Sequence, residues 1–145
     1  MKTEKVGVLV KSISLEFEKL LNPRLMKYDL TVSQYKLLGY LFRHKADTVI
    51  QADMEKFFSM THPTTSGLIK QLTKKGYVVR KKNPGDARSR VIMLTDKALE
   101  MEETLTGIAD AANSELTSSL TGEEREALIL ILNKVLAAFD KNFSE

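Results

Sequence analysis

The chain has 145 residues, a net charge of +3 and no cysteine. This length is enough for one domain with a buried core, and the lack of cysteine excludes a disulfide scaffold, a thiolate metal site and a cysteine redox switch. No apolar run approaches the ~20 residues of a membrane-spanning helix, and the charged N-terminal stretch is unlike a signal peptide, so we expect no membrane association and a cytoplasmic location.

The charge is distributed unevenly along the chain. Residues 61–97 carry nine basic and two acidic side chains, whereas residues 98–145 carry three basic and ten acidic ones. A polyanion would be attracted to the middle of the chain and repelled by its last third. A solvated surface of uneven charge gives the same totals, so the predicted elements have to distinguish between the two interpretations.

The first third of the chain predicts two helices. Apolar residues recur at helical spacing over 5–21, and Pro23 is expected to stop or bend this helix. Thr31 and Gln34 form a capping box that opens a second helix over 31–43.

The next two predicted helices form a helix-turn-helix pattern. A short helix over 51–58 is followed, after about three residues, by a helix that Thr61 caps and Gly76 ends. Thr61 is also a plain N-cap, and His62 is equally interpreted as a solvent-exposed histidine. The second helix carries the hydroxyl, imidazole and amino groups that can contact base edges or phosphates: Thr61, His62, Thr64, Thr65, Ser66 and Lys70.

Two β-rich runs, 77–82 and 91–95, flank a Pro-Gly tip loaded with arginine. A helix followed by a basic hairpin can present one element to the major groove of DNA and another to the minor groove. Arg88 and Arg90 lie just past the tip, and a guanidinium fits the narrow minor groove of A·T-rich DNA. Asp86 would be a poor contact for DNA, so we expect it to hold Arg88 in a bidentate pair; an ordinary surface salt bridge is the alternative.

Two further helices are predicted after the hairpin, over 95–118 and 121–142. With the first helix they are too apolar to lie alone, so we expect them to pack together, across a two-fold axis or within one chain. The expected fold class is mainly α with a small β-hairpin wing. It consists of a winged helix-turn-helix lobe, 30–95, flanked by N- and C-terminal dimerisation helices, 1–29 and 96–145.

Several motifs taken together are typical of a known family. The sharpest is Asp86-Ala87-Arg88 followed by Leu94-Thr95, and the others are Leu30-Thr31-Val32-Ser33-Gln34-Tyr35, Pro63-Thr64-Thr65-Ser66, Leu72-Thr73-Lys74-Lys75-Gly76-Tyr77-Val78 and Leu120-Thr121-Gly122-Glu123-Glu124. On these residues the chain resembles the MarR (multiple antibiotic resistance regulator) family of bacterial winged-helix transcription factors, over nearly its whole length.

The resemblance implies an obligate homodimer that binds a pseudo-palindromic operator in double-stranded DNA. It maps the family's wing arginine onto Arg88, the supporting aspartate onto Asp86 and the recognition-helix contacts onto residues 62–66. Members typically repress transcription and release DNA when a small, often anionic aromatic effector enters a crevice between the DNA-binding lobe and the dimer helices. Three residues near that crevice are ligand candidates that can also be interpreted as core or rim residues: Tyr28, Tyr35 and Arg43.

Two departures from the family pattern are visible. Ala98 stands where the family often has glycine, and the absence of cysteine rules out the thiol-sensing subgroup. We find no nucleophile with a base, no phosphate loop and no metal constellation, so neither an enzyme nor a bound cofactor or metal is expected. The leading hypothesis is a homodimeric DNA-binding repressor, and the alternative is a winged-helix protein-interaction module whose basic wing meets an acidic protein.

Overall fold

The computed structural model of the chain describes residues 5–139. Its elements follow in the order α1 (Val6–Met26), α2 (Val32–Arg43), α3 (Gln51–Phe58), α4 (His62–Lys74), β1 (Val78–Asn83), β2 (Asp86–Leu94), α5 (Asp96–Glu100), α6 (Glu102–Leu116) and α7 (Gly122–Ala137). None of the helices in this described range is both long and apolar enough to cross a bilayer.

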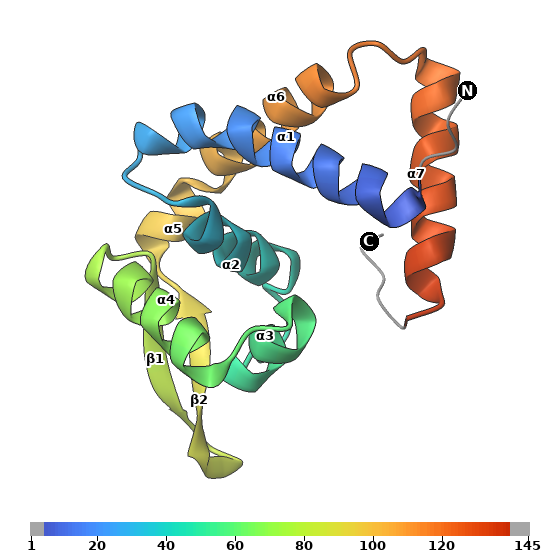
Figure 1. Ribbon diagram of the computed structural model, residues 1–145. Coiled ribbons are helices and arrows are strands. Elements are labelled where there is room, and N and C mark those ends of the chain that lie inside the picture. The colour runs from blue at the N-terminus through green and yellow to red at the C-terminus, as the bar shows by residue number, and fades with distance from the viewer. Residues whose placement is uncertain (1–4, 140–145) are drawn as a thin grey trace.

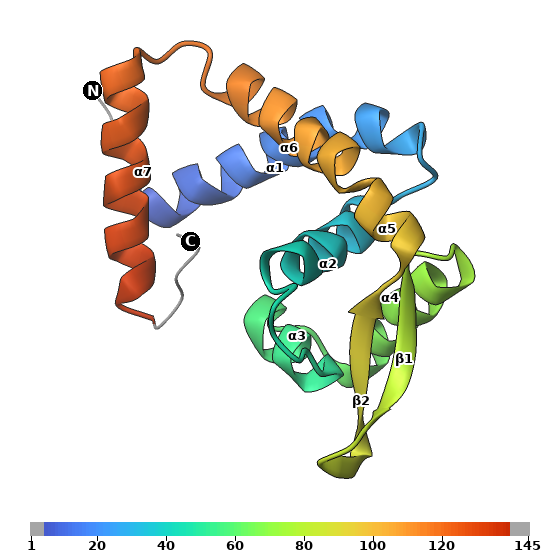
Figure 2. The ribbon, with the colours of Figure 1, turned by 180° about the vertical axis from the view of Figure 1, so that it is seen from behind.

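The elements form a lobe and a helical arm. Helices α2, α3 and α4 and the base of the hairpin share one hydrophobic core with the end of α1 and with α5 and α6, and the tip of the hairpin projects away from α1, α6 and α7 (Figure 1). Helix α6 packs along α1, while α7 stands apart from the lobe in both views (Figures 1 and 2). The mainly α fold with a two-stranded antiparallel wing is therefore as predicted.

The local end signals of the helices are confirmed. Thr31 and Gln34 exchange both bonds of a capping box at α2, and Thr121 and Glu124 do so at α7. Helix α4 ends with Gly76 at φ 83°, in the left-handed region that favours glycine. These short-range hydrogen bonds form within three or four residues, which is why the sequence alone predicts them.

The first helix is longer than predicted. It continues through Pro23 to Met26, because Leu21 and Leu25 extend its apolar stripe into the core and are both buried. Burial of two leucines outweighs the roughly 3 kcal/mol that an internal proline costs. The carbonyl left without its amide partner belongs to Lys19, whose side chain is exposed, so water can reach it.

The predicted single helix over 95–118 is instead two helices. Met101, with φ −92° and ψ −1°, interrupts the chain between α5 and α6, and α6 ends at Leu116. Leu99 was expected inside but is exposed, whereas Ala98 and Leu105 on either side of the break are buried. The break therefore turns the core-facing side from one helix to the next, and no glycine or proline marks it in the sequence.

The first hairpin strand has the predicted length, shifted by one residue, whereas the second begins at Asp86 and is longer than predicted. The register pairs Lys82 with Arg90 and then Asn83 with Asp86. The three residues of β2 between Asp86 and Arg90 therefore have no partner on β1 and form a bulge. The Asn83 side-chain oxygen accepts from the Gly85 amide at 3.1 Å and closes the turn. Bulges redirect side chains and increase local twist, and here the bulge contains Arg88.

The outermost helix lacks a buried face of its own. Helix α7 has no buried residue, and its described C-terminal end is Ala137, short of the predicted 142; residues 140–145 lie outside the described part. The first half of α1 is also exposed, although its apolar residues were expected to form a buried stripe. The exposed apolar residues include Val6, Leu9, Val10 and Ile13 of α1 and Leu128, Ile131, Leu132 and Val135 of α7.

Substituting Leu72 with alanine will lower the free energy of unfolding by about 2–5 kcal/mol, because this α4 side chain is fully buried and its removal leaves a cavity. Urea unfolding followed by circular dichroism measures the effect. Lys74→Ala, an exposed position on the same helix, is the control and should change stability by no more than about 0.5 kcal/mol. Equal losses for the two variants would contradict the packing described here.

Candidate nucleic-acid interface

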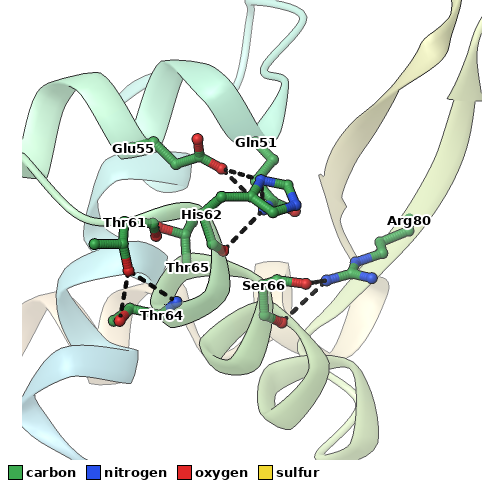
Figure 3. Close-up of polar contacts among 8 residues, drawn as sticks. All are labelled: Gln51, Glu55, Thr61, His62, Thr64, Thr65, Ser66 and Arg80. Carbon is green, nitrogen blue, oxygen red and sulfur yellow. Dashed lines mark hydrogen bonds and ion pairs between the residues drawn. The ribbon is translucent and has the colours of Figure 1, made fainter.

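The N-terminal turn of α4 presents polar groups to solvent on the side of the lobe that also carries the hairpin. The Thr61 hydroxyl caps the helix by accepting from the Thr64 amide at 3.3 Å, and it donates to the Thr64 hydroxyl at 2.9 Å (Figure 3). Both threonines are exposed, so the cap leaves their outer faces accessible. The helix therefore begins with an exposed hydroxyl pair that can contact phosphates, whereas the Thr64 and Thr65 amides are already bonded to Thr61 and Pro63 has no amide hydrogen.

Thr65 does not belong to this exposed set. Its side chain is 0% exposed, and its hydroxyl donates to the Thr61 carbonyl at 3.0 Å. Thr65 lies on the core side of α4, three residues from Leu68 and four from Ile69, whose side chains also face the core. The prediction that Thr65 contacts DNA is therefore wrong.

His62 is held against α3. Its Nδ1 lies 2.8 Å from Glu55 Oε2, and the Gln51 side-chain amide donates to the same carboxylate oxygen at 2.9 Å (Figure 3). The imidazole is nevertheless 74% exposed, whereas the Glu55 side chain is 21% exposed. A half-buried carboxylate on α3 thus holds an exposed ring at the start of α4.

Arg80 connects the hairpin to the middle of α4. Its guanidinium donates from β1 to the Ser66 carbonyl at 3.0 Å and to the Ser66 hydroxyl at 3.2 Å (Figure 3). One predicted contact residue, Ser66, therefore has its hydroxyl engaged within the protein. The bond fixes the spacing between α4 and the wing, which sets how two elements could enter adjacent grooves.

The wing presents a free guanidinium at its bulge. The Asp86 carboxylate accepts from the Arg88 backbone amide at 2.9 Å, and it makes no ion pair with the Arg88 side chain. The expected bidentate pair is therefore wrong: Asp86 shapes the backbone on which Arg88 sits. Asn83 adds a second restraint by donating to the Ser89 hydroxyl at 2.9 Å.

Arg90 behaves differently from Arg88. Its guanidinium turns back to the wing's own backbone and donates to the Ala87 carbonyl at 3.3 Å. Lys70 on α4 and Lys81 and Lys82 on β1 are exposed, with no acidic partner among residues 5–139. The exposed cations follow α4 and the hairpin, and this arrangement provides a continuous attraction for a polyanion.

A cavity of about 740 Å³ lies between the lobe and the long helices. Residues of α1, α2, α3 and α6 line it, and among them are Phe17, Tyr35, Phe42 and Arg43. Its size and its mixture of aromatic and charged groups suit a small molecule. Two of the three ligand candidates, Tyr35 and Arg43, are thus brought together, whereas Tyr28 packs against the hydrophobic core elsewhere.

The Tyr35 hydroxyl has a structural role at this cavity. It donates to the Leu105 carbonyl and accepts from the Ala109 amide, so it joins α2 to α6. Burial raises the pKa of this phenol, with the Ala109 amide acting in the opposite direction, so the group stays a neutral donor. Tyr35 therefore offers its ring, rather than its hydroxyl, to the cavity. Within the described range, no three His, Asp or Glu side chains gather as a metal-binding group.

These elements define a winged helix-turn-helix protein. A family model of the MarR family matches residues 28–89. The chain is 32% identical to S. aureus MepR in a MepR–DNA complex, with a TM-score of 0.79 and 94% of this chain and 99% of that chain covered.

Full-length relatives agree with this match. The chain is 28% identical to the multiple antibiotic resistance protein MarR of Escherichia coli, with 90% of each protein covered. It is 30% identical to the HTH-type transcriptional regulator YfiV of Bacillus subtilis, covering 77% of this chain and 70% of that protein. The chain belongs to the MarR family of transcriptional regulators.

Three residues of the site escaped the analysis of the sequence: Gln51, Glu55 and Arg80 as partners of α4. A single polar residue on α3 or β1 carries no pattern that distinguishes a partner of the next helix from a solvated side chain. For Glu55, the only available signal is its position on α3, seven residues before a histidine at the start of the next helix.

Proposed function

We propose that the chain is a sequence-specific double-stranded DNA-binding regulator, a repressor, that acts as a homodimer on a pseudo-palindromic operator. The observation that carries this proposal is the pairing of a free, exposed Arg88 guanidinium on the wing with an exposed N-terminal turn of α4. A projecting guanidinium suits the minor groove of DNA, and an exposed helix N-terminus suits the major groove. In the proposed regulator, residues 30–95 form the DNA-binding lobe, and residues 1–29 and 96–145 form the dimerisation region.

Similar proteins support a DNA partner. The comparisons include the MepR–DNA complex and a MarR variant from E. coli complexed with operator DNA, to which the chain is 28% identical with a TM-score of 0.77. The exposed cations on α4 and the hairpin of this chain are suited to binding DNA in the same way. Membership in a family of regulators argues against an enzyme, and it supports our proposal of a cytoplasmic location, where the DNA is.

The homodimer is supported by the unburied apolar faces. Helix α7 has no buried residue, and the apolar side chains of its stripe and of the first half of α1 would be exposed to water in a single chain. A second copy can cover the same faces symmetrically. Two copies also place two α4 helices on successive turns of the DNA, which strengthens binding without new contacts.

The cavity supports a small-molecule effector. It lies between the lobe and α1 and α6, so a bound molecule would contact both parts that move when the spacing of the two α4 helices changes. Arg43 and Lys36 line this cavity beside the carboxylates of Glu18 and Glu102, and Phe17 and Phe42 give it aromatic faces. We assign Tyr35 and Arg43, and not Tyr28, to this site.

Replacement of Lys70 by alanine tests the phosphate-contact part of the proposal. We expect the variant to bind all duplex sequences more weakly by a similar factor, and the slope of log K against log salt to fall by about 1. Fluorescence anisotropy at several salt concentrations measures both quantities. An unchanged slope would remove Lys70 from the interface.

The proposal as a whole is tested by duplex DNA binding at graded salt concentrations beside binding to an acidic protein of similar charge. Tight binding to duplex DNA, with two protomers per site, supports the regulator. Preference for the acidic protein would contradict it and would favour the protein-interaction module.

A further inference from the structure

The contact between α3 and the start of α4 fixes where a proton sits on His62. Glu55 Oε2 lies 2.8 Å from His62 Nδ1, and a carboxylate oxygen can only accept a hydrogen bond. Nδ1 also lies 3.1 Å from the Gln51 amide nitrogen, which is a donor; because the carboxylate is nearer and can only accept, while the Gln51 amide can donate to that carboxylate, we place the hydrogen of the neutral ring on Nδ1. The Gln51 amide, which donates to the same oxygen at 2.9 Å, holds the carboxylate in place.

The other ring nitrogen is left for a partner outside the chain. Nε2 has no hydrogen-bond partner among residues 5–139, and the ring is 74% exposed at the first residue of α4. In a neutral imidazole with a hydrogen on Nδ1, Nε2 is an acceptor. A neutral ring with its hydrogen on Nδ1 thus presents a lone pair at Nε2, and the ring lies beside the Gln51 and Glu55 side chains of α3 (Figure 3).

We propose that Glu55 is a positioning residue that fixes the Nδ1–H tautomer of His62, so that His62 Nε2 accepts a hydrogen bond from a base amino group in the major groove. This inference rests on the proposed DNA-binding function. In the major groove the base donors are the adenine N6 and cytosine N4 amino groups. A phosphate oxygen carries no hydrogen to donate, so a neutral Nε2 acceptor selects a base and not the backbone.

The fold does not depend on this pair. An ion pair or hydrogen bond to a ring that is three-quarters exposed contributes little to stability, since water competes for both partners. The pair instead restricts which of two tautomers the ring adopts. Without Glu55 the ring can place its hydrogen on Nε2, and the same nitrogen then donates to a base acceptor, such as guanine O6 or N7, adenine N7 or thymine O4, instead of accepting from an amino group.

The tautomer is measured on the full-length free protein by nitrogen-15 NMR of labelled histidine, recorded over a range of pH so that the neutral ring is observed. We expect His62 in the wild type to be the Nδ1–H tautomer and in Glu55→Gln to be a mixture. The matched control is Asp47→Asn, because Asp47 Oδ2 lies 3.1 Å from Nδ1 of the other histidine, His44. That control should leave the His62 signals unchanged.

The base preference is measured with the operator selected by the wild-type protein, in which each base pair is replaced in turn. We expect one position in each half-site to favour adenine or cytosine by about three- to ten-fold, the range for one net hydrogen bond. Glu55→Gln should lose this preference, whereas Asp47→Asn should keep it. An Nε2–H tautomer in the wild type, or an unchanged preference in Glu55→Gln, would overturn the proposal.

The two proposals fail in different ways. If the wild type selects no operator, the DNA-binding function fails and His62 has no base to contact, while the NMR result still reports on the pair. If the wild type selects an operator but Glu55→Gln shows the wild-type tautomer or preference, only the role of Glu55 is overturned.

Discussion

Val135→Glu will convert the dimer into monomers. Val135 belongs to the exposed apolar stripe of α7, near the C-terminal end of the helix, and is 50% exposed in the single chain. Covering the exposed half of this valine stabilises an interface by about 0.8–1.5 kcal/mol, and two-fold symmetry doubles the loss when it is removed. The buried carboxylates add a further cost because they have no partner. The dissociation constant of the dimer should rise by at least about 10²–10⁴-fold, as measured by sedimentation equilibrium.

The control is Lys134→Glu, the adjacent residue on α7, which is already charged and exposed. It adds more negative charge than Val135→Glu does, so a retained dimer in this variant shows that the apolar stripe, and not charge, is responsible. Circular dichroism should find both variants helical, because α7 has no buried residue in the single chain. A dimeric Val135→Glu protein would contradict the proposed interface.

Arg88→Ala will weaken operator binding by about 1–3 kcal/mol per half-site and reduce the preference for A·T pairs at the half-site ends. The Arg88 guanidinium has no partner among the described residues, so its removal leaves the wing intact while the Asp86–amide bond persists. Anisotropy titrations against operators with A·T or G·C pairs at those positions measure both effects.

Two variants separate shape from charge at the wing. Lys81→Ala removes an exposed cation from β1 and should weaken binding to every DNA sequence by a similar factor. Arg88→Lys keeps the charge but loses the planar guanidinium, so it should retain part of the affinity and lose most of the A·T preference. Equal discrimination by Arg88→Ala and the wild type would place the minor-groove contact elsewhere.

Local signals in the sequence predicted the fold better than long-range ones did. The capping boxes at Thr31 and Thr121 and the glycine at position 76 act within a few residues, and all three are confirmed. The continuation of α1 through Pro23 depends on Leu25 reaching a core built by later helices. The break at Met101 likewise depends on which residues meet the core on each side, and no residue type announces it.

The sequence predicted which segments form the candidate site, but not the orientation and hydrogen-bond partners of all their side chains. The helical stretch and the wing are where the sequence placed them, but Thr65 faces the core and Asp86 bonds to a backbone amide. Helical phase near an N-terminus is uncertain by one residue until the packing partners are known. Partners such as Glu55 and Arg80 come from other elements, so only the folded chain brings them to α4.

The most direct test of the account is selection of genomic fragments by the purified protein, with Arg88→Ala run in parallel. The account predicts recovery of one inverted-repeat site with half-sites about one helical turn apart, lost or weakened in the variant. Weak capture of all sequences alike, equally sensitive to salt in both proteins, would contradict a sequence-specific regulator and leave a basic protein-interaction module.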